Sequence, residues 1–142
     1  LYSFEMVPNF QRGHVWNETQ QIKYIEFVLR GGYSGKDIFW NCPRRMNSFK
    51  GPFQLVDGLQ RVSAVLAFLE NKIPVFGNYF KEWEGHLPTD CFFNMKVNVL
   101  KTPAEVLKWY LDLNEGGIIH SPEEIARVKL LLEEEENVNT KN

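Results

Sequence analysis

The residues best placed to do chemistry stand where an apolar strand pattern gives way to a helical one. In the segment "VDGLQRVSAVLAFL", Asp57 and Gly58 precede the helical pattern, and Gln60 and Arg61 lie in its first turn. Asp57 can cap this helix, with Gln60 completing a capping box and Gly58 easing the turn. Arg61 needs a further explanation, because a cation in the first turn faces the positive end of the helix dipole.

A bound phosphate would remove the conflict at Arg61. Backbone N–H groups at a helix N-terminus point toward such an anion, and the guanidinium fork matches its oxygens. A salt bridge from Arg61 to the carboxylate of Asp57 or Asp37 would also satisfy the charge. The residues alone leave both explanations open.

Two other polar clusters carry similar residue types. The segment "VPNFQRGHVW" places Gln11 and Arg12 after a short strand, and "LDLNEGGIIHS" places Asn114 before a Gly-Gly turn. Taken alone, Arg12 is an ordinary surface residue, and the glycines are a helix stop. Trp16, at the end of the first cluster, is expected to be a core anchor.

Strands and helices interleave among the elements that must position these clusters. The predicted strands are "YSFEMV", "DIFW", "FQLV" and "CFFNMKVNVL", the last with Phe93, Met95, Val97 and Val99 on one face. The segment "YFKEWEGHLPTD" is expected to be an irregular covering loop held down by its aromatic residues. Because the strands are few, short and partly alternating, the fold class is α+β, a compact domain rather than a doubly wound parallel sheet.

Helices are predicted where a polar cap precedes apolar residues at helical spacing. Asn17 and Gln20 form one capping box, and "TPAE" forms another, with Pro103 in the first helical position and the helix running to about Leu113. The apolar positions of the three other helices are Ile22, Ile25, Val28 and Leu29, then Val62, Val65, Leu66 and Leu69, and then Ile125, Val128, Leu131 and Leu132.

The composition limits the class of protein. The 142 residues, 44% of them hydrophobic, suffice for one domain with a core, and a net charge of -2 gives no general attraction to nucleic acid or anionic membranes. We expect the domain to span residues 1–132 and an acidic, frayed tail to span residues 133–142. No apolar run reaches the length of a membrane span, so a cytoplasmic protein without a membrane partner is expected. Cys42 and Cys91 lack metal-type spacing and are expected to be free thiols.

Together, the three polar clusters resemble the N-terminal domain of GmrSD-type (type IV) restriction proteins. That family belongs to the ParB/sulfiredoxin-like superfamily, whose signature is Gln-Arg followed by Asp-Gly-x-Gln-Arg, and the resemblance covers about residues 5–128. It implies a small mixed sheet packed with helices and a bacterial or phage source. It also implies binding of a nucleoside triphosphate (NTP) with Mg²⁺, by an NTPase or the remnant of one, in systems that restrict modified DNA.

The resemblance carries over to this sequence residue by residue. It implies that Asp57, Gln60, Arg61 and Gln11 are catalytic, and that Arg12, Gly58, Arg61 and Asn114 bind the nucleotide. Arg12 and Arg61 would share one cleft and neutralise phosphate oxygens during phosphoryl transfer. Asp57 would hold Mg²⁺ or orient an arginine, and Gln60 or Gln11 would position a water.

Other cofactor chemistries are not expected. His14, His86 and His120 are isolated, no Cys–His cluster suggests zinc, and neither a haem nor a flavin site is expected. No glycine-rich P-loop precedes a Lys-Ser or Lys-Thr pair. Leu59 and Gln60 stand where sulfiredoxin chemistry requires a cysteine, which excludes that activity.

Two alternative functions stay open. A short member of the family can act without catalysis, by pairing with a separate nuclease, forming a homo-oligomer or interfering with a defence complex. An apolar last helix in need of cover would favour that function. A ParB-like DNA-binding or nuclease module is the other alternative, with the loop residues Arg44, Arg45 and Lys50 as its DNA contacts, although an ordinary solvated loop is the simpler explanation of these residues.

Overall fold

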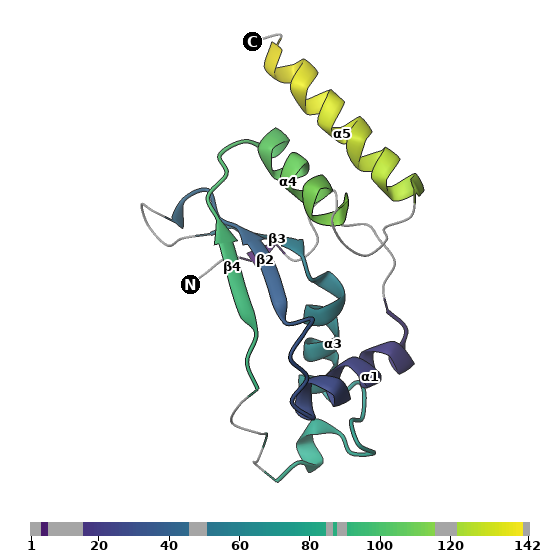
Figure 1. The fold of residues 1–142 in the computed structure, drawn as a ribbon. Helices are drawn as coiled ribbons and strands as arrows, with labels where there is room; N and C mark the ends of the chain where they lie inside the picture. The colour runs from purple at the N-terminus through teal and green to yellow at the C-terminus, as the bar shows by residue number, and fades with distance from the viewer. Residues whose placement is uncertain are drawn as a thin grey trace. The chain divides into compact units, whose positions relative to one another are not determined.

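The computed structural model describes residues 4–5, 16–45, 51–84, 87, 91–115 and 122–140, in which strands and helices interleave (Figure 1). In chain order these elements are β1 (Phe4–Glu5), α1 (Glu18–Leu29), β2 (Asp37–Asn41), β3 (Phe53–Asp57), α3 (Leu59–Leu69), the 3₁₀ helix η1 (Phe80–Glu82), β4 (Asn94–Asn98), α4 (Pro103–Glu115) and α5 (Pro122–Thr140). The predicted α+β class is confirmed. No helix in the described ranges is long and apolar enough to cross a membrane.

The strands form one mixed sheet in the order β1-β3-β2-β4. β1 runs parallel to β3, with Phe4 opposite Phe53, and β2 runs antiparallel to β3, with Asn41 opposite Gln54. The small mixed sheet predicted from the sequence is therefore present, and β4 lies at one of its edges.

The predicted apolar face of β4 is only partly covered. The strand is shorter than the alternating pattern suggested, and 55% of the surface of Met95 is exposed, whereas Val97 is half-buried. An edge strand has a neighbour on one side only, which reduces the cover that its side chains receive.

The chain divides into two compact units, each with its own core. The first unit contains Leu1–Gly13, Phe39–Asp57 and Lys96–Asn142, and the second contains His14–Ile38 and Gly58–Met95.

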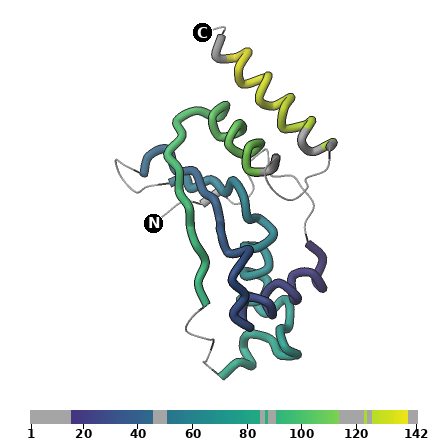
Figure 2. The backbone as a smooth tube through the Cα atoms, in the orientation of Figure 1, coloured from purple at the N-terminus to yellow at the C-terminus, as the bar shows by residue number. Residues whose placement is uncertain are grey.

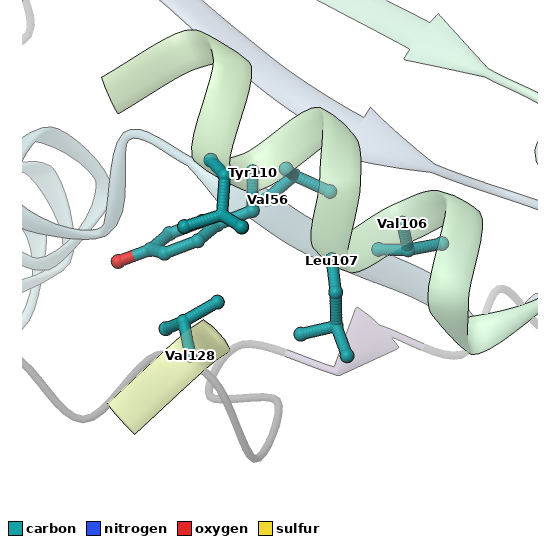
Figure 3. Packing of buried hydrophobic residues seen from close by; sticks show 6 residues of the cluster. Val56, Val106, Leu107, Tyr110 and Val128 are labelled. Carbon is teal, nitrogen blue, oxygen red and sulfur yellow. The ribbon is translucent and has the colours of Figure 1, made fainter. Parts of the chain in front are cut away.

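The core of the first unit forms where α4 packs against α5 and β3. Its buried members are Val56, Val106, Leu107, Tyr110, Leu111 and Val128. Figure 3 shows Leu107 and Tyr110 extending from α4 toward Val128 on α5. Leu131 and Leu132 pack against the same cluster, so α4 covers the apolar face of α5. The expectation that this face lacks cover within the chain is therefore wrong.

The core of the second unit forms between α1 and α3, which lie beside each other (Figure 2). Ile25 on α1 meets Ala64 and Phe68 on α3, and the rings of Phe80 and Trp83 pack edge-on against Phe68 at 5.5 and 5.9 Å. In the described part of the predicted covering segment, aromatic residues do pack onto the core, although this part includes the 3₁₀ helix η1; residues 85–86 and 88–90 lie outside the described residues.

The buried face of α3 differs from the predicted one. Leu66 and Leu69 are more than two-fifths exposed, and the helix buries Ala64 and Phe68 instead. Two sets of contacts explain why this face of α3 is buried. Ala64 packs in the same core as Ile25 of α1, and the ring of Phe68 contacts the aromatic rings of the segment after the helix.

Two of the three predicted capping boxes are present, at the starts of α1 and α4. The Asn17 side chain accepts from the Gln20 N–H at 2.9 Å, and the Gln20 side chain accepts from the Asn17 N–H at 3.0 Å. At α4, Glu105 N–H donates to Thr102 Oγ1 at 3.3 Å, and Glu105 Oε2 accepts from the Thr102 N–H at 3.1 Å. These backbone donors, Thr102 first and Lys101 second, lower the pKa of Glu105. Helix α4 ends at Glu115, two residues beyond the predicted end, and α5 continues through the acidic segment to Thr140.

Candidate functional site

Gly58 forms the turn between β3 and α3. Asp57 is the last residue of β3, and Gly58 occupies the N-cap of α3 with φ +111°, in the left-handed region. A Cβ at this position would lie 3.2 Å from Cγ2 of Ile38 and 3.4 Å from its Cα. Conformation and space therefore both demand glycine here. The interpretation of Asp57 as the N-cap is wrong, because the chain needs the left-handed turn one residue later.

Gln60 makes a long-range contact instead of a capping box. Its Oε1 accepts a hydrogen bond from the Trp16 backbone N–H at 2.7 Å. Trp16 immediately precedes Asn17, the N-cap of α1. The side chain of Gln60 thus ties the start of α1 to the start of α3.

Arg61 is satisfied by a main-chain oxygen. Its Nη1 donates to the carbonyl oxygen of Asp37 at 2.6 Å, and the side chain is half-buried. The Asp37 carboxylate, in contrast, accepts from Nδ2 of Asn94 at 3.0 Å. The charge of Arg61 thus meets the dipole of a main-chain carbonyl.

Tyr24, on α1, also belongs to this site, and no feature of the sequence signalled its role. Its hydroxyl donates to the carbonyl oxygen of Gly35 at 2.6 Å, and its ring lies 5.1 Å from the ring of Trp16. Burial raises the pKa of Tyr24 to about 12, with the nearby charge of Arg61 acting in the opposite direction. The hydroxyl therefore keeps its proton at neutral pH and acts as a donor.

These contacts form a closed circuit within the second unit. Gln60 accepts a hydrogen bond from the Trp16 N–H, and the ring of Trp16 packs on that of Tyr24. Tyr24 donates to the Gly35 carbonyl, and Arg61 donates to the carbonyl of Asp37, two residues after Gly35. Gln60 and Arg61 are neighbours on α3, so the contacts begin and end at adjacent residues of the motif.

The other predicted site residues have different positions. Arg44 and Arg45 are exposed in the turn after β2, and Asn114 lies near the end of α4. All three belong to the first unit, as Asp57 does, whereas Gly58, Gln60 and Arg61 belong to the second. The remaining predicted residues, Gln11, Arg12 and Lys50, lie outside the described residues.

The basic turn gains a cation that the sequence did not suggest. Exposed Lys101 donates from its ammonium group to the carbonyl oxygen of Pro43, next to Arg44 and Arg45. These cations are far apart in the sequence, and the hydrogen bond from the Cys42 N–H to the Asn98 carbonyl helps to bring them together.

Metal-ligating side chains do not gather in the described part of the chain. No group of three or more His, Cys, Asp or Glu residues could hold a metal ion there. Cys42 and Cys91 are both free thiols, the first of them buried. Asp57 lies immediately before Gly58, the N-cap of α3.

Comparison with known families identifies the chain. The family model for the N-terminal domain of the GmrSD restriction endonuclease matches residues 2–98, more than half of the sequence. The chain belongs to this family, and it is a module related to restriction systems. The match includes both Gln-Arg motifs and ends before the Asn114 segment. No curated protein and no solved structure matches the sequence.

Proposed function

We propose that the chain binds a nucleoside triphosphate at the start of α3, with its phosphates on Arg61, Arg12 and the first-turn N–H groups. The observation that carries this proposal is the Gly58 turn. The first helical hydrogen bond there runs from the Val62 N–H to the Gly58 carbonyl at 3.0 Å. The N–H groups before Val62 have no acceptor within the helix, and a glycine N-cap has no side chain to offer them.

Arg61 suits a phosphate ligand because its guanidinium is already oriented. The bond to Asp37 engages one N–H of a group that carries several in a planar fork. Such a fork can bind phosphate oxygens with little further loss of side-chain entropy. In phosphoryl transfer, this charge would also stabilise the negative charge that builds on the equatorial oxygens.

The participation of Arg12 in this proposal rests on the order of the motifs in the sequence. Gln11 and Arg12 precede the Asp57–Arg61 motif, as in the family signature.

Mg²⁺ fits the proposal with one protein ligand. Mg²⁺ in nucleotide sites is commonly held by one or two carboxylates together with substrate phosphates, and Asp57 is such a carboxylate. When bound, the ion would supply further neutralisation of phosphate charge. Gln11 is the better candidate to orient a hydrolytic water, because the Gln60 oxygen already accepts from Trp16.

Titration calorimetry with ATP, GTP and CTP in the presence of Mg²⁺ tests this function. We expect one of the nucleotides to bind, and Arg61→Ala to weaken the binding about 10- to 100-fold, as loss of a charged hydrogen-bonding group does. Arg61→Lys keeps the charge without the fork and should fall between the two. Arg30→Ala is the matched control, because Arg30 lies in the same unit but stacks on Phe76 instead. If the wild-type protein binds none of the three nucleotides, the proposal fails.

DNA binding by the basic turn is a second candidate function, which the position of Lys101 favours. Arg44, Arg45 and Lys101 together can neutralise only a few phosphates. We expect weak binding to duplex DNA, with a slope of log affinity against log salt of about -2 to -3. Affinity that persists unchanged at high salt would contradict this assignment.

A partner subunit, either a separate nuclease or a second copy of the chain, is a third candidate. Phe92 and Met95 favour it: Met95 lies on the edge strand β4 and is 55% exposed, and Phe92 lies just before this strand and is 62% exposed. Light scattering coupled to size-exclusion chromatography tests for self-association. A strict monomer that retains no nuclease subunit would contradict it.

A further inference from the structure

One side chain outside the motif, that of Tyr24, links the contacts of Gln60 to those of Arg61. Tyr24 is half-buried on α1, and it meets both the segment that Gln60 holds and the loop that Arg61 holds. Gly35 sits between Tyr24 and Arg61: a Cβ built on it would lie 3.9 Å from Cε2 of Tyr24 and 4.0 Å from Nε of Arg61. The tyrosine ring and the arginine side chain thus both lie close to the backbone of Gly35.

The hydroxyl of Tyr24 is one of the donors that hold the segment leading into β2. Gly35 has φ +66°, so the backbone turns there, and nearby Tyr33 is fully exposed. Tyr24 donates to the Gly35 carbonyl and Arg61 to the Asp37 carbonyl, both at 2.6 Å, and the Asn94 N–H donates to the Lys36 carbonyl at 2.9 Å. Loss of the Tyr24 bond removes the attachment of the segment at Gly35.

We infer that Tyr24 is a positioning residue for Arg61, acting through the Gly35–Asp37 loop to hold the guanidinium ready for the phosphates of the nucleotide. This inference rests on the proposed nucleotide site. A preoriented side chain binds more tightly because less conformational entropy is lost when the ligand arrives. Tyr24 does not touch the ligand, and it acts by keeping the Asp37 carbonyl in place.

Tyr24→Phe is the decisive variant, because it removes the hydroxyl and keeps the ring packed on Trp16. Two measurements read its effect. Nitrogen-15 relaxation of the Arg61 Nε–H group, without nucleotide, reports how rigidly the guanidinium is held. Calorimetry with the nucleotide that wild type binds, with Mg²⁺, reports affinity. We expect a lower heteronuclear NOE at Arg61 Nε and binding that is about 3- to 10-fold weaker.

Tyr33→Phe is the matched control. It removes the same hydroxyl from a fully exposed tyrosine two residues from Gly35. We expect it to change neither the Arg61 signal nor the affinity.

The outcomes separate this inference from the proposed function. A merely structural tyrosine would lower the melting temperature of Tyr24→Phe while leaving the Arg61 Nε signal and the affinity unchanged, and that result would overturn the inference. If wild type binds no nucleotide, the proposed function fails and the nucleotide part of the inference fails with it. The relaxation measurement then still shows whether Tyr24 holds Arg61.

Discussion

At the scale of single residues, Arg61 shows how the fold accommodates an unfavourable charge. A cation in the first turn of α3 opposes the helix dipole, yet its guanidinium donates a 2.6 Å hydrogen bond to the Asp37 carbonyl. The negative end of that carbonyl dipole offsets the conflict in part. The proposed phosphate would be an additional ligand of the same guanidinium.

Gly58 gives a prediction at the same scale. Gly58→Ala forces a side chain into the left-handed region and places its Cβ 3.2 Å from Ile38. The left-handed conformation alone costs about 1–2 kcal/mol, and the crowding adds roughly 1–3 kcal/mol. Urea denaturation should show the loss in the free energy of unfolding.

Gly77→Ala is the control for this prediction. Gly77 also has positive φ, +80°, but a Cβ added there would meet no atom within 4 Å. The variant should lose only the conformational part. Equal losses for the two variants would mean that the contact with Ile38 carries no cost.

At the scale of elements, the contact between α4 and α5 fixes the first unit. Val128 on α5 is fully buried against α4, whereas Val138, further along the same helix, is 58% exposed. At the helix surface, the ion pair between Lys108 and Glu136 adds little, because both side chains are about half exposed or more. Apolar burial on one face of α5 is thus the main contribution of the helix to this core.

The two valines of α5 provide a matched pair of variants. Val128→Ala removes buried methyl groups and should lower the free energy of unfolding by about 1–3 kcal/mol. Val138→Ala should change it by less than about 0.5 kcal/mol, because that side chain is mostly solvated. Chemical denaturation measures both. Similar losses at the two sites would show that the second half of α5 is also packed.

At the scale of the whole molecule, the region that matches the family covers one hydrophobic core but only part of the other. The match ends at residue 98, whereas the first core draws most of its members from α4 and α5, beyond that limit. The buried members of the second core lie between Ile25 and Val75, inside the match. The segment after residue 98 therefore completes a core whose strand lies within the matched region.

A fragment of residues 1–98 tests this division. It lacks α4 and α5, so Val56 on β3 loses all of its buried partners in the first core. We expect the Val56 amide to exchange with solvent much faster in the fragment, while Ala64 and Phe68 in α3 stay protected. Hydrogen exchange followed by NMR measures the three amides. Retained protection at Val56 would contradict the assignment of this core to α4 and α5.

The local signals in the sequence predicted the elements well. The capping boxes at Asn17 and Thr102 depend on residues three positions apart, and the strand "FQLV" depends on a short apolar run. The resemblance based on the polar clusters correctly indicated the GmrSD family. The face of α3 was mispredicted because the spacing of Val62 and Leu66 does not show which neighbours the helix meets.

The sequence by itself determined the α+β class, the starts of α1 and α4 and the family, because caps and periodicity act over a few neighbouring residues and the order of the motifs is read directly along the chain. The tertiary structure decided what Gln60 and Arg61 hold, since their partners Trp16 and Asp37 lie 44 and 24 residues away. It alone brought Tyr24 and Gly35 into the same circuit. A side chain can signal its chemical type locally, but its hydrogen-bond partner depends on which distant backbone groups the packing of the helices leaves within reach.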